Sequence, residues 1–343
     1  MSKGLKMKHL LLTFAVGASV MASPLVKEAK DNGLVAIPAD KAALNKLTEN
    51  PKNKMTPAKV ELGKKLYFDP RLSKSGLISC NTCHNLSEGG DDGVGAAIGH
   101  NWTANPHHLN SPTVYNAVFA EKQFWDGRSP DLEDQAKGPM LAAPEMAAST
   151  EHIEAVVNSM PEYVAAFKKA YGKDVKIDFH AIANTIGLFE RTLVTPSRFD
   201  DFLNGDEKAL SKAEKEGLKT FITTGCTSCH NGIALGGGMQ GFAITGDFKH
   251  AKVGDFKGDA NGLVKTPTLR NVTQTAPYFH NGTVWNLKEA IQEMGRIQLG
   301  VNISDKDAAS IETFLKALDG RKPEIMLPIL PASTESTPKP DVN

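Results

Sequence analysis

All four cysteines of this 343-residue chain belong to two copies of the motif Cys-x-x-Cys-His. This motif is the attachment signal for c-type haem, because its two thiols form thioethers with the haem vinyl groups. The histidine that follows lies beneath the iron and serves as its proximal ligand. We therefore predict two covalent c-type haems. The two attachment sites are Cys80-Asn-Thr-Cys83-His84 and Cys226-Thr-Ser-Cys229-His230.

Three other uses of Cys-x-x-Cys explain these residues less well. A zinc site would leave the two adjacent histidines without a role. A thioredoxin-like redox pair would need a parallel sheet, for which the sequence gives no sign. A structural disulfide within each motif would close a very small loop. Repetition of the whole pentapeptide, with no cysteine left over, favours haem.

Residues 1–22 are predicted to form a signal peptide. Lysines at the start precede an apolar run from Leu10 to Val20, and Val20-Met21-Ala22 offers small residues for cleavage. The run is shorter than the ~20 residues that a transmembrane helix needs, and an uncleaved interfacial anchor is the alternative. Export of a protein with c-type haem indicates the periplasm.

Composition and length limit the partners and the number of domains. The 39 basic and 39 acidic side chains balance, so nucleic acid is not an expected partner. The length suits two compact domains, which we place at residues 45–193 and 194–321, one haem in each. Residues 322–343, rich in Pro, Ser and Thr near their end, are predicted to be a mobile tail or a strap.

The periodic segments indicate helices, and strand signals are few. We predict an all-α fold of two cytochrome c-like domains with long connecting loops, among them the glycine-rich segments 89–99 and 232–241. Capping residues mark four helix starts ahead of apolar stripes. These caps are Thr56 before Pro57, Asp178, Ser211 with Glu214, and Ser304, whose helix should stop at Gly320.

The two halves of the chain share a pattern at a constant offset of 155 positions (267 − 112). Each half has Cys-x-x-Cys-His, a loop, Pro-Thr-x-x-Asn and then a helix, which predicts a duplicated cytochrome-like unit. The matching pairs are Pro112 and Pro267, Thr113 and Thr268, Asn116 and Asn271, Phe124 and Phe279, Gly127 and Gly282, and Leu132 and Leu287.

The second half offers a thioether for the far side of its iron. Leu287, Ile291 and Met294 share one helical face, so Met294 is the candidate ligand and Met239, in a glycine-rich loop, is its rival. A methionine on an apolar stripe can also simply fill the core. Ligation by histidine and methionine raises the haem potential and leaves no open position for a substrate.

The first half differs, because Pro139 stands where the repeat would put the methionine ligand. His100, at the end of the first glycine-rich loop, is our candidate ligand there, with His107 and His108 as rivals. Glycines ease rearrangement of a backbone segment, so this histidine could bind iron in one state and leave in another. The sequence thus predicts one closed iron and one that opens.

An iron that opens beside a carboxylate suits hydrogen peroxide as substrate. Cleavage of the O–O bond requires a proton to move between the two oxygens, and a distal carboxylate can move it. Glu145 is the candidate acid/base, and Gln135 could add a hydrogen bond. On sequence alone, each residue could equally be an ordinary surface side chain.

With these residues in place, the chain from about Leu62 to Gly320 resembles the bacterial di-haem cytochrome c peroxidases. The resemblance covers most of the chain after residue 22 and rests on specific motifs. They are Cys-Asn-Thr-Cys-His-Asn-Leu-Ser, Ile-Gly-His100, Asn110-Ser-Pro-Thr-Val, Gln-Phe-Trp125-Asp-Gly-Arg128, Gln135-Ala-Lys-Gly-Pro, Glu145-Met146, Ala-Pro277-Tyr-Phe-His280 and Met294-Gly.

The resemblance implies a role for each matched position. The N-terminal haem would be peroxidatic, with His100 departing on activation, Glu145 as acid/base and Gln135 beside it. The C-terminal haem would transfer electrons, and Trp125 would couple the two haems. A small cytochrome c or a cupredoxin would be the electron donor, and a homodimer is common in the family. Calcium between the domains would be bound by the Asn110 side chain and the carbonyls of Thr275 and Pro277, oxygen ligands that this ion prefers.

Two segments depart from the family pattern, and two other functions compete with peroxidase activity. The segment 236–265 is short, and the pair His107-His108 is unusual, so electron entry and the loop that carries His100 could differ. A non-catalytic di-haem cytochrome would keep both irons six-coordinate. A MauG-type enzyme, which oxidises a partner protein, would have a tyrosine ligand where this chain has Met294.

Overall fold

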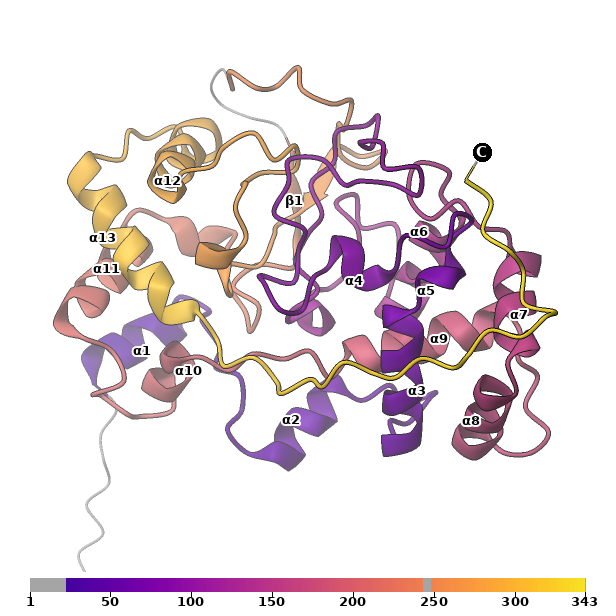
Figure 1. Ribbon diagram of the computed structural model, residues 1–343. Coiled ribbons are helices and arrows are strands. Elements are labelled where there is room, and N and C mark those ends of the chain that lie inside the picture. Colours follow the sequence, from indigo (N-terminus) through magenta and orange to yellow (C-terminus); the bar gives the residue numbers. More distant parts are fainter. Residues whose placement is uncertain (1–22, 243–247, 343) are drawn as a thin grey trace, which may run out of the picture.

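The computed structural model describes residues 23–242 and 248–342, and the chain is mostly helical (Figure 1). The predicted signal peptide lies outside the described residues. The elements up to residue 203 are α1 Pro24–Asp31, α2 Lys41–Thr48, α3 Pro57–Phe68, η1 Pro70–Leu72, α4 Cys80–Cys83, η2 Ala117–Phe119, α5 Leu132–Gln135, α6 Lys137–Leu141, α7 Thr150–Ser159, α8 Pro161–Tyr171, α9 Phe179–Glu190 and α10 Arg198–Leu203. They are followed by α11 Lys212–Thr223, η3 Cys226–Ser228, β1 Met239–Gly241, β2 Leu263–Lys265, η4 Val272–Gln274, α12 Leu287–Met294, the π-helical turn η5 Gly295–Leu299, α13 Asp305–Leu315 and η6 Lys316–Leu318.

The four predicted helix starts are confirmed. Each cap accepts a hydrogen bond from a backbone amide of the first turn, which satisfies a donor that the helix itself leaves free. At α11 the bond is reciprocal, because the Glu214 carboxylate accepts from the Ser211 amide at 2.8 Å. The last helix continues as a 3₁₀ turn and ends just before Gly320, as predicted.

The all-α prediction is wrong in one place, where β1 and β2 form a small antiparallel sheet. Met239 pairs with Lys265 and Gly241 pairs with Leu263. The sequence does not predict this sheet, because Met-Gln-Gly shows no alternation of apolar and polar residues and the strand is stabilised by pairing with β2. The end of the glycine-rich segment 232–241 is therefore a strand rather than a loop.

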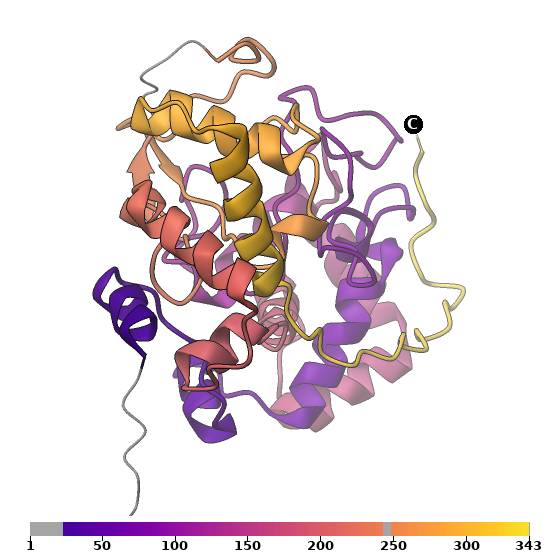
Figure 2. The same cartoon turned by 90° about the vertical axis from the view of Figure 1, so that its left-hand side faces the viewer.

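Each half is built around one pair of crossing helices and has its own apolar cluster. In the first half α3 crosses α9, and in the second α11 crosses α13, which Figure 2 shows in front of the first half. A glycine lies at each crossing. A Cβ on Gly63 would lie 2.2 Å from the Thr185 oxygen, and one on Gly217 would lie 2.1 Å from the Ser310 oxygen. Within each pair, the two helices therefore approach so closely at the glycine that no larger side chain fits there.

The repeat predicted from the offset of 155 is confirmed in the backbone. Asn116 and Asn271 both adopt the left-handed conformation, with φ of 62° and 61°. Their side-chain amides donate to the same hydroxyl, that of Thr195, at 2.7 and 2.9 Å. Isolated bridges also recur at this offset, as Gln123 with Ser129 and as Tyr278 with Val284. The two halves thus meet at Thr195 through equivalent asparagines.

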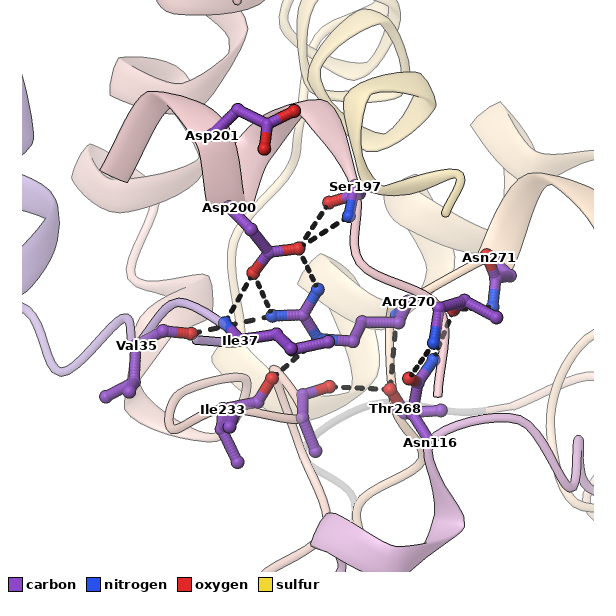
Figure 3. A network of polar contacts seen from close by, with 12 residues as sticks. Val35, Ile37, Asn116, Ser197, Asp200, Asp201, Ile233, Thr268, Arg270 and Asn271 are labelled. Carbon is purple, nitrogen blue, oxygen red and sulfur yellow. Dashed lines mark hydrogen bonds and ion pairs between the residues drawn. The ribbon is translucent and has the colours of Figure 1, made fainter. Parts of the chain in front are cut away.

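The N-terminal segment packs on the second half. Leu25, Val26 and Leu34 belong to the apolar cluster of that half. The segment is held further by the buried pair of Asp200 and Arg270, because the Ile37 amide donates to Asp200 at 2.7 Å (Figure 3). Residues 24–37 are thus held against the second half, where the Gly232 amide donates to the Gly33 carbonyl close to the second haem-attachment motif.

The C-terminal segment runs in the other direction, across the first half to α7 (Figure 1). Arg71 donates to the Pro331 carbonyl at 2.8 Å, and Ser159 contacts the Thr337 hydroxyl at 2.8 Å. The C-terminal segment therefore lies as a strap across the surface of the first half, which is one of the two forms predicted for it. No helix within residues 23–242 or 248–342 is long and apolar enough to cross a membrane.

Candidate haem sites

The second attachment motif opens onto an apolar cavity that could hold a haem. Cys226, Cys229 and His230 line it, and so does Met294. None of the chain's four cysteines forms a disulfide, so the thiols are available for thioether bonds. Other lining residues are Phe221, Leu269, Leu287, Ile291, Leu299, Ile303 and Leu315. An apolar cavity with two thiols and two candidate axial ligands has the composition that a covalent haem requires.

The proximal histidines are oriented by backbone carbonyls in both halves. His230 Nδ1 donates to the Leu235 oxygen at 3.2 Å, and His84 Nδ1 donates to the Pro112 oxygen at 2.9 Å. These bonds fix the tautomer that leaves Nε2 free for iron. Burial lowers the pKa of His84 and lowers that of His230 to about 4, so both rings are neutral near pH 7.

Met294 is the last residue of α12, whose Asn286 cap accepts from the Glu289 amide at 3.0 Å. Leu287 and Ile291 line the cavity from the same helix, as expected for one apolar face. Met239 lies elsewhere, because its sulfur would be 2.6 Å from a Cβ on Gly127. Of the two candidate methionines, Met294 is the one in the cavity with His230.

In the first half, the Tyr67 hydroxyl donates to the His84 carbonyl at 2.7 Å and so fixes the attachment motif. Pro139 lies in α6 and has no ligating atom, as the offset implies. The adjacent Met140 is 1% exposed and packs in the apolar cluster of the first half. The first half therefore does not repeat the methionine arrangement of the second.

His100 and Glu145 lie next to each other in the first half. The His100 amide donates to the Glu145 carbonyl at 2.7 Å. The chains touch so closely that a Cβ on Gly99 would lie 2.2 Å from the Pro144 oxygen, which explains a glycine there. His100 Nδ1 is buried without a hydrogen-bond partner. The structure thus places the backbone of the candidate distal ligand directly beside the backbone of the candidate acid/base.

Opposing effects act on the Glu145 carboxyl. Burial raises its pKa above the ordinary value, while the charges of Arg128 and His107 act to lower it. Arg128 lies over the Phe124 ring at 3.4 Å and pairs with Asp126 at 2.9 Å. The sequence analysis did not identify Arg128 as a charge near Glu145, since nothing in its spacing links the two.

The remaining candidates of the first half are less directly connected. Gln135 ends α5 and is half-buried, and no hydrogen bond joins it to Glu145 among the described residues. His107 pairs with Asp255 of the second half at 2.9 Å. His108 has its Nδ1 buried without a partner, as His100 does, so it remains a rival ligand.

Trp125 connects the two halves. Within the first half its indole nitrogen donates to the Asn110 carbonyl at 2.9 Å, and across to the second half its ring meets the His280 ring edge-on, with the ring centroids 6.4 Å apart. Trp125 also lines the cavity of the second half, although it belongs to the first. An aromatic ring in this position suits electronic coupling, and it also packs the interface.

The predicted calcium ligands lie together at the same interface. Asn110 Nδ2 donates to the Pro277 carbonyl at 2.7 Å. Thr275 lies two residues before Pro277, directly after η4. Asn110 Oδ1 is buried without a hydrogen-bond partner, an arrangement that a bound cation would satisfy. Within the described residues no three His, Cys, Asp or Glu side chains form a metal site, so any calcium here depends on amide and carbonyl oxygens.

The helical fold and the two attachment motifs define a protein with two c-type haem attachment sites. The chain belongs to the di-haem cytochrome c peroxidase family, because a family model of that description matches residues 57–208 and closely similar relatives span most of the chain. It is 48% identical over 294 residues to cytochrome c551 peroxidase of Pseudomonas aeruginosa, covering 82% of this chain and 84% of that protein.

Further comparisons agree with this assignment. Cytochrome c551 peroxidase of Nitrosomonas europaea is 46% identical over 287 residues, covering 81% of this chain and 85% of that protein. The solved structure of a MauG-like protein associated with microbial copper homeostasis is 26% identical, with a TM-score of 0.69. It covers 79% of this chain and 92% of that one.

Proposed function

We propose that the chain is a periplasmic peroxidase that reduces hydrogen peroxide to water with electrons from a small cytochrome c or a cupredoxin. The observation that carries the proposal is the asymmetry of the halves. Met294 lines one cavity with His230, whereas the first half has Pro139 at that position and holds His100 beside Glu145 instead. Peroxidase relatives at 46–48% identity support the same activity.

The two halves have different tasks in this proposal. The domain at residues 45–193 carries the peroxidatic haem on Cys80, Cys83 and His84, with His100 as a ligand that departs. The domain at residues 194–321 carries the electron-transfer haem on Cys226, Cys229 and His230, with Met294 as a permanent ligand. When bound, the first haem supplies the iron at which peroxide is cleaved, and the second stores an electron.

Glu145 moves the proton that cleavage of the O–O bond requires. Its carboxylate accepts a proton from one peroxide oxygen and returns it to the departing oxygen, which leaves as water. The overall reaction takes two electrons and two protons for each peroxide and forms two water molecules. Partial burial of the carboxylate raises its pKa, which makes it a better proton acceptor than an exposed glutamate.

A backbone hydrogen bond links the segment of His100 to the segment of the acid/base. The His100 amide donates to the Glu145 carbonyl, so a movement of the backbone at His100 would also disturb the segment that carries the acid/base. Trp125 would carry electrons between the haems, and Gln135 would add a polar group to the pocket. Calcium held by Asn110, Thr275 and Pro277 would stabilise the interface between the two halves. The homodimer that the resemblance implies stays a prediction.

Substitution of Glu145 by glutamine tests the proposal. We expect peroxide turnover to fall by ~10²-fold or more, with both haems attached, because the proton carrier is lost. Glu151→Gln is the matched control, since this glutamate lies on the exposed first turn of α7. Near-normal turnover of Glu145→Gln would remove this residue from the mechanism. A protein whose haems both stay six-coordinate in every redox state would instead be an electron carrier.

A further inference from the structure

We propose that Asp91 and Asp92 form the charged wall of the calcium site and determine how tightly the ion binds. The inference rests on the proposed function, in which calcium is held by Asn110, Thr275 and Pro277. It goes further, because it assigns two carboxylates of the first half to the recognition of a divalent cation. The two acids would act on the ion through its water ligands and by their charge.

Asp91 lies against the backbone of the second half that would bind the ion. A Cβ on Gly89 would lie 2.5 Å from Asp91 Oδ1, 2.4 Å from the Gln274 carbonyl oxygen and 2.9 Å from Thr275 Cγ2. The carboxylate and the segment before Pro277 therefore meet at this glycine. Asp91 is only 3% exposed, an unusual position for an acidic side chain without a cation.

Asp92 approaches the same site from the side of Asn110. Its carboxylate accepts a hydrogen bond from the Ser111 hydroxyl at 2.8 Å, one residue after Asn110. Asn110 is itself 7% exposed, and its Oδ1 has no partner. Two neighbouring carboxylates and an unpaired amide oxygen thus converge with backbone carbonyls, which also present negative charge.

Positive charge is missing from this group. Among the described residues no basic side chain pairs with Asp91 or Asp92, and the nearby Glu88 adds to the repulsion. The Lys322 ammonium donates to the Glu88 carbonyl. Asp91 is buried and Asp92 is half-buried, so their like charges raise one another's free energy, and a divalent cation would relieve this.

The arrangement predicts opposite effects of one substitution. Asp91→Asn keeps the shape and removes one charge, so calcium should bind at least about tenfold more weakly, because the attraction between a divalent ion and a nearby unit charge is screened less at a buried carboxylate than in water. The calcium-free protein should become more stable, because the repulsion is gone. A side chain with a purely structural role would lower stability in both states.

The experiment measures calcium affinity by isothermal titration calorimetry on the haem-loaded protein after treatment with a chelator. Thermal unfolding is recorded with calcium and with chelator. We expect Asp91→Asn and Asp92→Asn each to weaken binding about tenfold and Asp91→Asn to raise the melting temperature in chelator. Asp174→Asn, at an exposed position of the first half, is the control for net charge.

The outcomes separate this inference from the calcium site itself. If the protein binds no calcium, or if Asn110→Ala binds it as tightly as the unmodified chain, the proposed site is wrong and the inference falls with it. If Asn110→Ala abolishes binding while both Asp variants bind normally, the site stands and the role of the two carboxylates is refuted.

Discussion

Substitution of Asp200 by asparagine should destabilise the protein strongly. The Asp200 carboxylate accepts two bonds from the Arg270 guanidinium, at 2.8 and 2.9 Å, in a pair whose side chains are 2% and 0% exposed. It also accepts from the amides of Ile37 and Ser197, both at 2.7 Å (Figure 3). Asparagine keeps the shape but leaves the Arg270 charge buried and uncompensated.

The magnitude follows from burial and distance. Two unit charges ~4 Å apart interact by about 4 kcal/mol at the effective dielectric constant of ~20 that suits proteins. Removal of one partner from a buried pair costs ~3–5 kcal/mol in other proteins, which agrees. Because a domain is stable by only ~5–15 kcal/mol, a loss of this size should shift the urea midpoint markedly. The N-terminal segment should also loosen, since Ile37 loses its anchor.

The neighbouring residue provides a matched control. Asp201 pairs with Arg321 at 2.8 Å, but these side chains are 38% and 60% exposed. Asp201→Asn should therefore cost at most ~1 kcal/mol, since solvent screens an exposed pair. Urea denaturation of both haem-loaded variants, followed by far-ultraviolet circular dichroism, compares the two costs. Equal losses of stability in the two variants would refute the argument from burial.

Three further perturbations test other parts of the account. Met294→His should lower the higher haem potential by on the order of tenths of a volt, within the ~0.8 V range of potentials that different axial ligands produce. If a redox titration gives unchanged potentials, another residue is the ligand. Arg128→Gln should move the acid limb of the pH profile of kcat/KM for peroxide to higher pH, because the pKa of Glu145 rises further and only its ionised form accepts a proton. Arg128→Lys keeps the positive charge and should leave the profile unchanged. If the Arg128→Gln variant and the unmodified chain have the same pH profile, Arg128 does not act on Glu145. Gly217→Ala should cost ~1–3 kcal/mol, because its Cβ would lie 2.1 Å from the Ser310 oxygen, whereas Gly241→Ala has open space; similar unfolding midpoints would contradict the close crossing.

The helix starts could be predicted because their causes are local. A cap such as Thr56 or Ser304 satisfies amides within its own first turn, so the signal lies within a few residues. The haem motifs are also local, since thiols and histidine are adjacent. The repeat could be read from its offset, although its meeting point at Thr195 could not, because that residue lies outside the repeated pattern.

Contacts between segments that are far apart in the sequence could not be predicted from it. The N-terminal segment meets Asp200 across 163 positions, and no pattern in either segment predicts the other. Strand β1 depends on its partner for the same reason. The calcium ligands were inferred from family resemblance alone. The sequence does not place Asp91 near them, because Gly89, beside Asp91, and Thr275 meet only in the folded chain.

A redox titration of the purified haem-loaded protein, followed by EPR spectroscopy, tests the central claim most directly. The account predicts two haems of unlike ligation. After half-reduction the haem with methionine ligation should be reduced, and the other should lose its histidine and accept an added ligand. A single haem, or two haems that remain closed to added ligands in every redox state, would contradict the account.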